Sequence, residues 1–209
     1  MSDRAMLEGN GAALVRERAL AVRVQAALER AYGLDRVADV GEYMSGADDG
    51  GREALLVREA RDGTVEVRLQ VPRLEGEPKL DVLCQIIEGV SHFVVVVDRA
   101  STGRETTCLE LELQAEVDKW LVIAASMAAF DTERSAFLRE RLYERVVYPD
   151  GAHTEVGERY RVANDVAHRF VRRLENDYVR AGRYADLRAA LRRFFHGGQE
   201  EKLRLGRVA

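Results

Sequence analysis

The segment between Pro78 and Phe130 constrains the fold most, because it holds the longest apolar periodicity in the chain. A stop at Gly103 and a capping-box pattern, with Thr107 followed by Glu110, divide the segment into two helices. In both halves the apolar residues recur at three- and four-residue steps, which places them on one helical face: Leu80, Leu83, Ile87, Val90, Val94 and Val97, then Leu109, Leu113, Val117, Trp120, Ala124 and Met127. We therefore expect an antiparallel helical hairpin.

A strand is the competing interpretation for two short stretches of this segment. Residues 94–97 are a run of β-branched valines, and within residues 108–113 leucine alternates with glutamate as it does in a half-buried strand. The long helical stripe that passes through both stretches favours helix.

The remaining patterns predict an α+β protein that is mostly α. A helix from Ala12 to Tyr32 precedes an antiparallel hairpin of strands, Ala54–Ala60 and Val65–Val71, with a third strand expected within Val37–Met44. Further helices are expected over residues 132–146, 156–178 and 187–196, and residues 199–209 are expected to be a loose tail. The whole chain, 1–209, is interpreted as one domain, in which the helix and small antiparallel sheet of 11–77 pack on a bundle, 78–209, of five or six helices.

Composition limits the class of protein. Hydrophobic residues make up 46% and charged residues 33%, which excludes a wholly disordered chain, and the net charge of -4 argues against a surface built throughout for nucleic acid. Only three of the 32 basic residues are lysines, a balance typical of GC-rich bacterial genes. No signal peptide or uninterrupted membrane-spanning apolar stretch is visible, so we expect a cytoplasmic protein with no membrane contact.

The hairpin geometry brings four polar residues to similar heights. If it turns near Arg104, His92 lies level with Glu116, while Glu88 and Glu112 each lie about one turn away. These four residues are the candidate ligands of a divalent metal, and Glu116 with His92 is a candidate acid/base pair. Glu88 and His92 lie opposite the apolar stripe, so the alternative is a solvated pair of surface residues.

Asn164 and His168 are further candidates for a catalytic site. Asn164 borders the apolar face of its helix and His168 follows one turn later, so both could join Glu116 if the helices meet. The alternative is a hydrogen-bonded core asparagine beside a surface histidine.

Three functional hypotheses follow. Because no phosphate-binding loop, nucleophile elbow or Cys-x-x-Cys pair occurs, the first is a non-catalytic interaction or regulatory module with a protein partner or a second copy of itself. The second is a metal-assisted or acid/base enzyme that uses the residues above. The third is nucleic-acid binding by C-terminal arginines with stacking tyrosines: Arg169, Arg172, Arg173, Arg180, Arg183, Arg188, Arg192 and Arg193 with Tyr178 and Tyr184.

Overall fold

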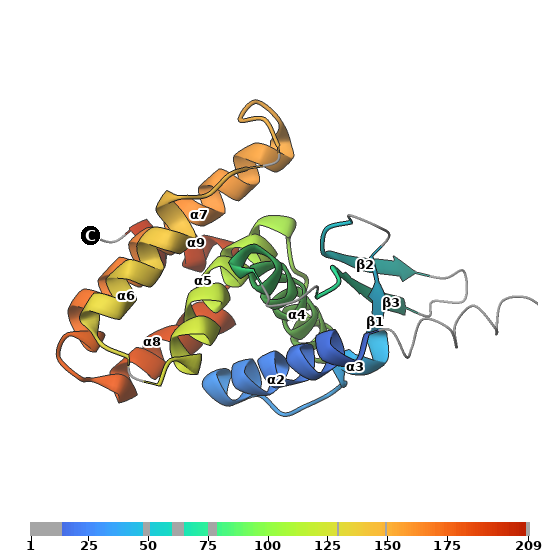
Figure 1. The fold of residues 1–209 in the computed structure, drawn as a ribbon, viewed down its shortest axis with the longest axis horizontal. Helices are drawn as coiled ribbons and strands as arrows, with labels where there is room; N and C mark the ends of the chain where they lie inside the picture. The colour runs from blue at the N-terminus through green and yellow to red at the C-terminus, as the bar shows by residue number, and fades with distance from the viewer. Residues whose placement is uncertain are drawn as a thin grey trace, which may run out of the picture.

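The computed structural model describes residues 14–47, 51–59, 65–74, 79–128, 130–148 and 150–207. Within these residues the protein is α+β and mostly α, with a three-stranded sheet at one end of a helical assembly (Figure 1). The predicted fold class is confirmed. Eight α-helices are described, and six of them lie within residues 78–209, where a bundle of five or six was expected.

The predicted helical hairpin is confirmed. Helix α4 covers Leu80–Ser101 and helix α5 covers Cys108–Ser126, so the valine run and the leucine-glutamate alternation are both helical. Gly103 adopts a positive φ of 65° after α4, and the Thr107 side chain accepts a hydrogen bond from the backbone N–H of Glu110. The apolar stripes thus decided the structure over the local β propensity.

The sheet is mixed rather than wholly antiparallel. Strands β2 (Ala54–Glu59) and β3 (Val65–Val71) pair antiparallel as expected, with Val57 opposite Val67. The third strand, β1 (Met44–Gly46), pairs in parallel with β3, which lies in the centre of the sheet.

The third strand begins later than predicted. The side chain of Asp39 accepts a hydrogen bond from the backbone N–H of Gly41 and starts a short helix, α3 (Val40–Tyr43), so most of the expected strand is not extended. Aspartate is a strong helix cap, which overrides the weak alternation of this stretch.

The other helices lie close to their predicted positions. Helix α2 ends at Gly33, which has a φ of 72°, and two helices continue into π-helical turns that finish at Glu144 and Val179. Their bounds are α2 Val15–Tyr32, α6 Thr132–Arg139, α7 Glu155–Leu174, α8 Tyr184–His196 and α9 Gln199–Arg207.

Helix α9 corrects the prediction of a loose tail. Lys202 is fully buried, and its ammonium donates a 2.6 Å hydrogen bond to the backbone oxygen of Phe194 in α8. Leu205 is also buried. The C-terminal segment is therefore a docked part of the bundle, held by a residue whose charge made it look like a surface residue.

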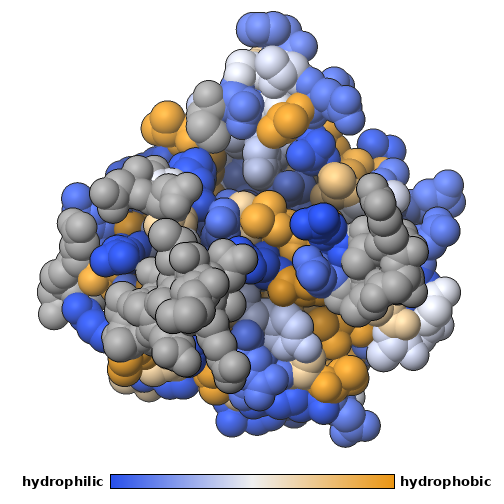
Figure 2. All heavy atoms as spheres, turned by 90° about the vertical axis from the view of Figure 1, so that its right-hand side faces the viewer, coloured by the Kyte–Doolittle hydropathy of each residue, from blue (hydrophilic) through white to orange (hydrophobic). Residues whose placement is uncertain are grey.

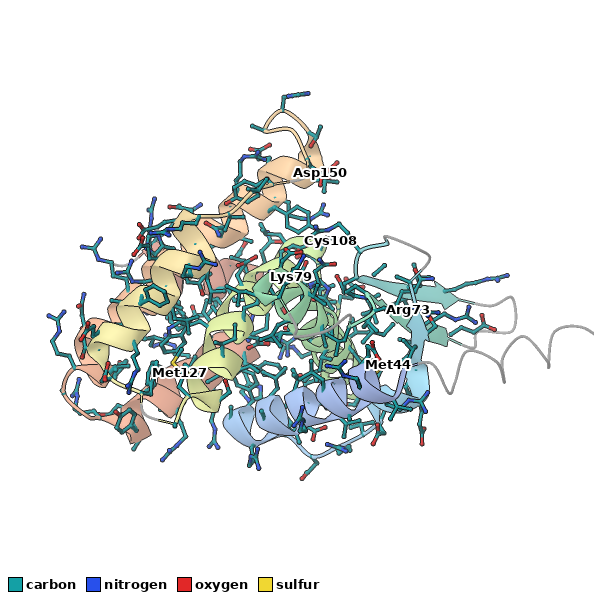
Figure 3. All side chains as sticks on the ribbon, viewed as in Figure 1. Met44, Arg73, Lys79, Cys108, Met127 and Asp150 are labelled. Atoms are coloured by element: carbon teal, nitrogen blue, oxygen red, sulfur yellow. The ribbon has the colours of Figure 1, made fainter. Side chains whose placement is uncertain are left out.

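Helix α4 lies at the centre of the molecule. The sheet packs on one side of it and α5 on another, with α6 to α9 beyond α5 (Figure 1). In Figure 3, Met44 and Arg73 mark the sheet end, whereas Met127 marks the far end of α5. Every residue from Gln85 to Val95 is buried as a result.

By length and composition α4 could also cross a membrane, although 61% of its most apolar window is buried inside the fold. Such burial is typical of the core helix of a water-soluble protein.

Candidate metal centre

Three of the predicted metal ligands meet between α4 and α5. One ligand atom from each of Glu88, His92 and Glu112 lies within 4.8 Å of the other two, and all three residues are buried. We call these residues the ligand triad. Glu88 and His92 are four residues apart and share one face of α4, whereas Glu112 faces them from α5.

The expected solvation of Glu88 and His92 is wrong. Each is only 8% exposed. The face of α4 opposite the apolar stripe is covered as well, so polarity along a helix did not indicate contact with water here.

Glu116 joins this region through a lysine. The Lys119 ammonium lies 2.8 Å from Glu88 Oε2 and 2.8 Å from Glu116 Oε1. Glu116 is thus a partner of Lys119 rather than a member of the ligand triad.

The imidazole of His92 lies between two carboxylates from different elements. Its Nδ1 is 3.5 Å from Oε1 of Glu53, which precedes β2, and its Nε2 is 3.9 Å from Oε2 of Glu112. Both His92 Nε2 and Glu53 Oε1 are buried without a hydrogen-bond partner. Buried polar atoms are rarely left unpaired, so the unpaired Nε2 of His92, which faces Glu112, indicates a missing ligand.

Burial and the neighbouring charges shift the pKa values of the triad. Burial would lower the pKa of His92, but Glu53, Glu112 and Glu88 raise it to about 9. Burial raises the pKa of Glu112 to about 7, against the opposing effect of His92. Burial also acts to raise the pKa of Glu88, but Lys119 and His92 outweigh it and lower that pKa. Near pH 7 and without a metal, His92 is therefore protonated and Glu112 is partly protonated.

The charged groups around the triad have a net negative charge, which favours binding of a divalent cation. Four carboxylates, those of Glu53 and Glu116 and the two of the triad, face the fixed cations Lys119 and Arg159, the latter with its Nε 3.7 Å from Glu112 Oε1. Exposed Arg52 adds a weaker positive influence at Glu88. With His92 neutral, as a metal ligand must be, two negative charges remain.

His168, another predicted site residue, makes its side-chain contacts outside the triad. His168 Nε2 is 2.8 Å from Arg139 Nη1 and 3.5 Å from Glu144 Oε1, and its ring stacks on Tyr143. Tyr143 in turn donates a hydrogen bond to the backbone oxygen of Glu116. His168 thus reaches the Glu116 backbone through Tyr143 and makes no recorded contact with the carboxylates of the triad.

Asn164 is buried, but the interpretation as a hydrogen-bonded core asparagine is only half correct. Its exposed fraction is 6%, and its Nδ2 has no hydrogen-bond partner.

Sequence reasoning missed Glu53, Lys119 and Arg159. Glu53 and Arg159 are far from the hairpin in sequence, and only a glycine inside α4 could have indicated a close approach there: an added Cβ at Gly89 would lie 2.7 Å from Glu53 Cγ. Lys119 carried a compositional signal, since lysine is rare in this chain and two of its three lysines are buried.

A second buried polar cluster joins the same two helices to α2 and α9, and it is fully hydrogen-bonded. We call it the Asp118 network, and it comprises Tyr32, Ser91, Gln114, Asp118 and Lys202. The Asp118 carboxylate accepts hydrogen bonds from Tyr32 Oη, Ser91 Oγ at 2.6 Å and Gln114 Nε2 at 2.8 Å. Gln114 Oε1 accepts from the Lys202 ammonium at 2.6 Å. No atom of these five side chains is among the unpaired buried atoms of the described residues.

Two cavities lie away from the triad. One of about 310 Å³ is bounded by α2 and α4 and includes Glu29, Phe93 and Asp98; the other, of about 710 Å³, lies beside α6 and includes Met127 and Phe137. Figure 2, which faces the sheet end, shows hydrophobic residues in the middle of that face among hydrophilic ones. Neither cavity includes a residue of the triad.

No family model, no curated protein and no solved structure matches the chain. The functional conclusion therefore comes from the residues and geometry of the site.

Proposed function

We propose that the protein binds one divalent transition-metal ion between α4 and α5, with Glu88, His92 and Glu112 as its ligands. The observation that carries the proposal is the convergence of three buried ligand atoms within 4.8 Å, one of them the unpartnered Nε2 of His92. An imidazole with two carboxylates suits Zn²⁺, Mn²⁺ or Fe²⁺, whereas Ca²⁺ and Mg²⁺ prefer oxygen ligands alone.

The ion's role in this proposal is regulatory rather than catalytic. It would link two helices that also carry the sheet and α7, so its binding would stabilise the fold. The two cavities described above, each large enough for an organic ligand, do not include a residue of the triad.

A direct test is zinc affinity, measured by chelator competition on protein purified without a histidine tag. We expect one ion per chain in the wild type. At a free zinc concentration of about 100 times Kd, binding adds about 2.7 kcal/mol to the free energy of unfolding, which raises Tm by about 5–10 °C.

Two substitutions with matched controls locate the site. Glu112→Gln and His92→Gln are expected to weaken zinc binding by about 100-fold or more, beyond the usual effect of losing an outer partner of a ligand. Glu105→Gln and His153→Gln make the same changes at exposed positions and should leave the affinity unchanged. A wild type with no zinc affinity, or equal affinity in Glu112→Gln, would contradict the proposal.

Metal-assisted catalysis is the second candidate, and one observation favours it. Three protein ligands leave a position of a four-coordinate ion open to water, as in hydrolytic zinc sites. Turnover of activated ester or phosphoester substrates by the zinc-loaded wild type, lost in His92→Gln, would support catalysis over a purely regulatory role.

The other hypotheses stay predictions. A protein partner would find exposed apolar side chains in Phe137, beside the larger cavity, and in Val147. Nucleic-acid binding is less favoured, because Arg169, Arg183 and Arg193 of the proposed patch are paired with carboxylates. The cytoplasmic location is also a prediction.

A further inference from the structure

Glu53 reaches the metal site from the sheet across the surface of α4. It lies just before β2, its backbone N–H donates a 3.2 Å hydrogen bond to Gln85 Oε1, and its side chain is only 8% exposed. Gly89 makes this approach possible, because an added Cβ there would lie 2.7 Å from Glu53 Cγ and 2.9 Å from Glu53 Oε1. A larger residue at this position would displace both the Glu53 side chain and Leu69 of β3, whose Cδ1 would lie 2.6 Å from the added Cβ.

The carboxylate of Glu53 meets the side of the imidazole that does not face Glu112. Nδ1 of His92 is 3.5 Å from Glu53 Oε1, whereas Nε2 is 3.9 Å from Glu112 Oε2. A histidine that binds a metal through one nitrogen commonly donates the hydrogen on its other nitrogen to a carboxylate, which holds the ring and its tautomer. Glu53 stands where that outer carboxylate is required, and its Oε1 has no other partner.

We infer that Glu53 is a positioning residue for the metal site. It accepts the hydrogen of His92 Nδ1 and leaves Nε2 free to bind the ion. Because Glu53 belongs to the segment that leads into β2, the metal site is complete only when the sheet is seated on α4. This inference rests on the proposed metal binding and adds a regulatory link between the ion and the sheet.

The test compares zinc affinity in Glu53 variants by chelator competition. Glu53→Met removes the acceptor at similar length and should weaken zinc binding by about 10–100-fold. Glu53→Gln keeps an oxygen acceptor and should recover part of that loss. Glu66→Met, an exposed position on β3 of the same sheet, is the control and should bind zinc as the wild type does.

Gly89→Ala tests the same link from the helix side. We expect it to weaken zinc binding as Glu53→Met does, because both remove the carboxylate from the ring. In the Glu53→Met background it should cause little further loss of affinity, since the contact is already absent. A purely structural role for Gly89 would instead give additive losses.

The tautomer of His92 supplies a readout that general destabilisation would not change. Nitrogen-15 NMR of the zinc-bound wild type should show a protonated Nδ1 and a metal-bound Nε2. Zinc bound through Nδ1, or wild-type affinity in Glu53→Met, would overturn the inference while leaving the metal site intact. If the wild type binds no zinc, the proposed function fails. The role of Glu53 can still be tested on metal-free protein, by comparing the tautomers of neutral His92 in the wild type and in Glu53→Met. Equal tautomer populations in the two proteins would refute that role.

Discussion

Helices α4 and α5 carry two buried polar clusters that differ in how completely their atoms are paired. In the Asp118 network the carboxylate accepts from three side chains, and the Lys202 ammonium donates to Gln114 and to the Phe194 backbone. Beside the ligand triad, three buried atoms have no hydrogen-bond partner: His92 Nε2, Glu53 Oε1 and Arg159 Nε. A paired network needs nothing more to be stable in the core, whereas an unpaired one needs a ligand. Both clusters are buried, so burial does not distinguish them. They differ in whether their polar atoms have hydrogen-bond partners.

The largest expected effect comes from breaking the paired cluster. Asp118→Ala leaves Tyr32, Ser91 and Gln114 without their acceptor and removes one of the two carboxylates that favour the charged form of Lys202, so it should lower the free energy of unfolding by about 3–5 kcal/mol. Urea unfolding monitored by circular dichroism measures this change. Zinc affinity, compared under conditions where the variant is folded, should stay within about threefold of the wild type. Asp118 lies on the same helix as Glu112, but its oxygens are already hydrogen-bonded and it is not a ligand of the ion. A loss below about 1 kcal/mol would remove the distinction between the clusters.

The pH dependence of zinc affinity is the next largest effect. The pKa of His92 is raised to about 9 and that of Glu112 to about 7, so below pH 9 the metal-free site holds a proton that the ion must displace, and below pH 7 it holds more than one. The metal-free state binds more protons than the metal-bound state, so affinity rises with pH. Chelator competition should show a gain of at least about 100-fold between pH 6 and pH 8. A flat profile would exclude these two residues as ligands.

The smallest effect is expected in the unpaired cluster without metal. Burial raises the pKa of Glu112, which means that its charged form is unfavourable in the folded protein. Glu112→Gln removes this charge and should change the free energy of unfolding of metal-free protein by less than about 1 kcal/mol, in either direction. Chemical denaturation in the presence of a chelator provides the measurement. A cost of several kcal/mol would show that the cluster stabilises the fold as the Asp118 network does, without a ligand.

The sequence predicted the helical pair and the heights of its polar residues, because periodicity and one turn position determine which residues of a hairpin lie level. It did not predict their burial. The expectation that Glu88 and His92 face water assumed that α4 has one covered side, whereas Lys119 of α5 pairs with Glu88 and Glu53, just before β2, covers His92. That covering depends on long-range packing, which no local pattern in α4 encodes.

Other residues were missed for similar reasons. Glu53 lies 39 positions before His92 and reaches it only because the sheet folds back over Gly89. Lys202 was assigned to a loose tail, since a lone lysine among polar residues gives no signal of burial. Both residues contact partners that are distant in sequence. The pattern of polar and apolar residues along one helix cannot identify such partners.

X-ray absorption spectroscopy at the zinc edge, on the zinc-loaded, tag-free protein, tests directly whether Glu88, His92 and Glu112 bind the ion. We expect a first coordination shell of nitrogen and oxygen only, with the outer scattering of one imidazole. The free thiol of Cys84 has a pKa raised by burial to about 12 and should not bind the ion. A shell that contains sulfur, or one that lacks an imidazole, would contradict the assignment of Glu88, His92 and Glu112 as the metal ligands.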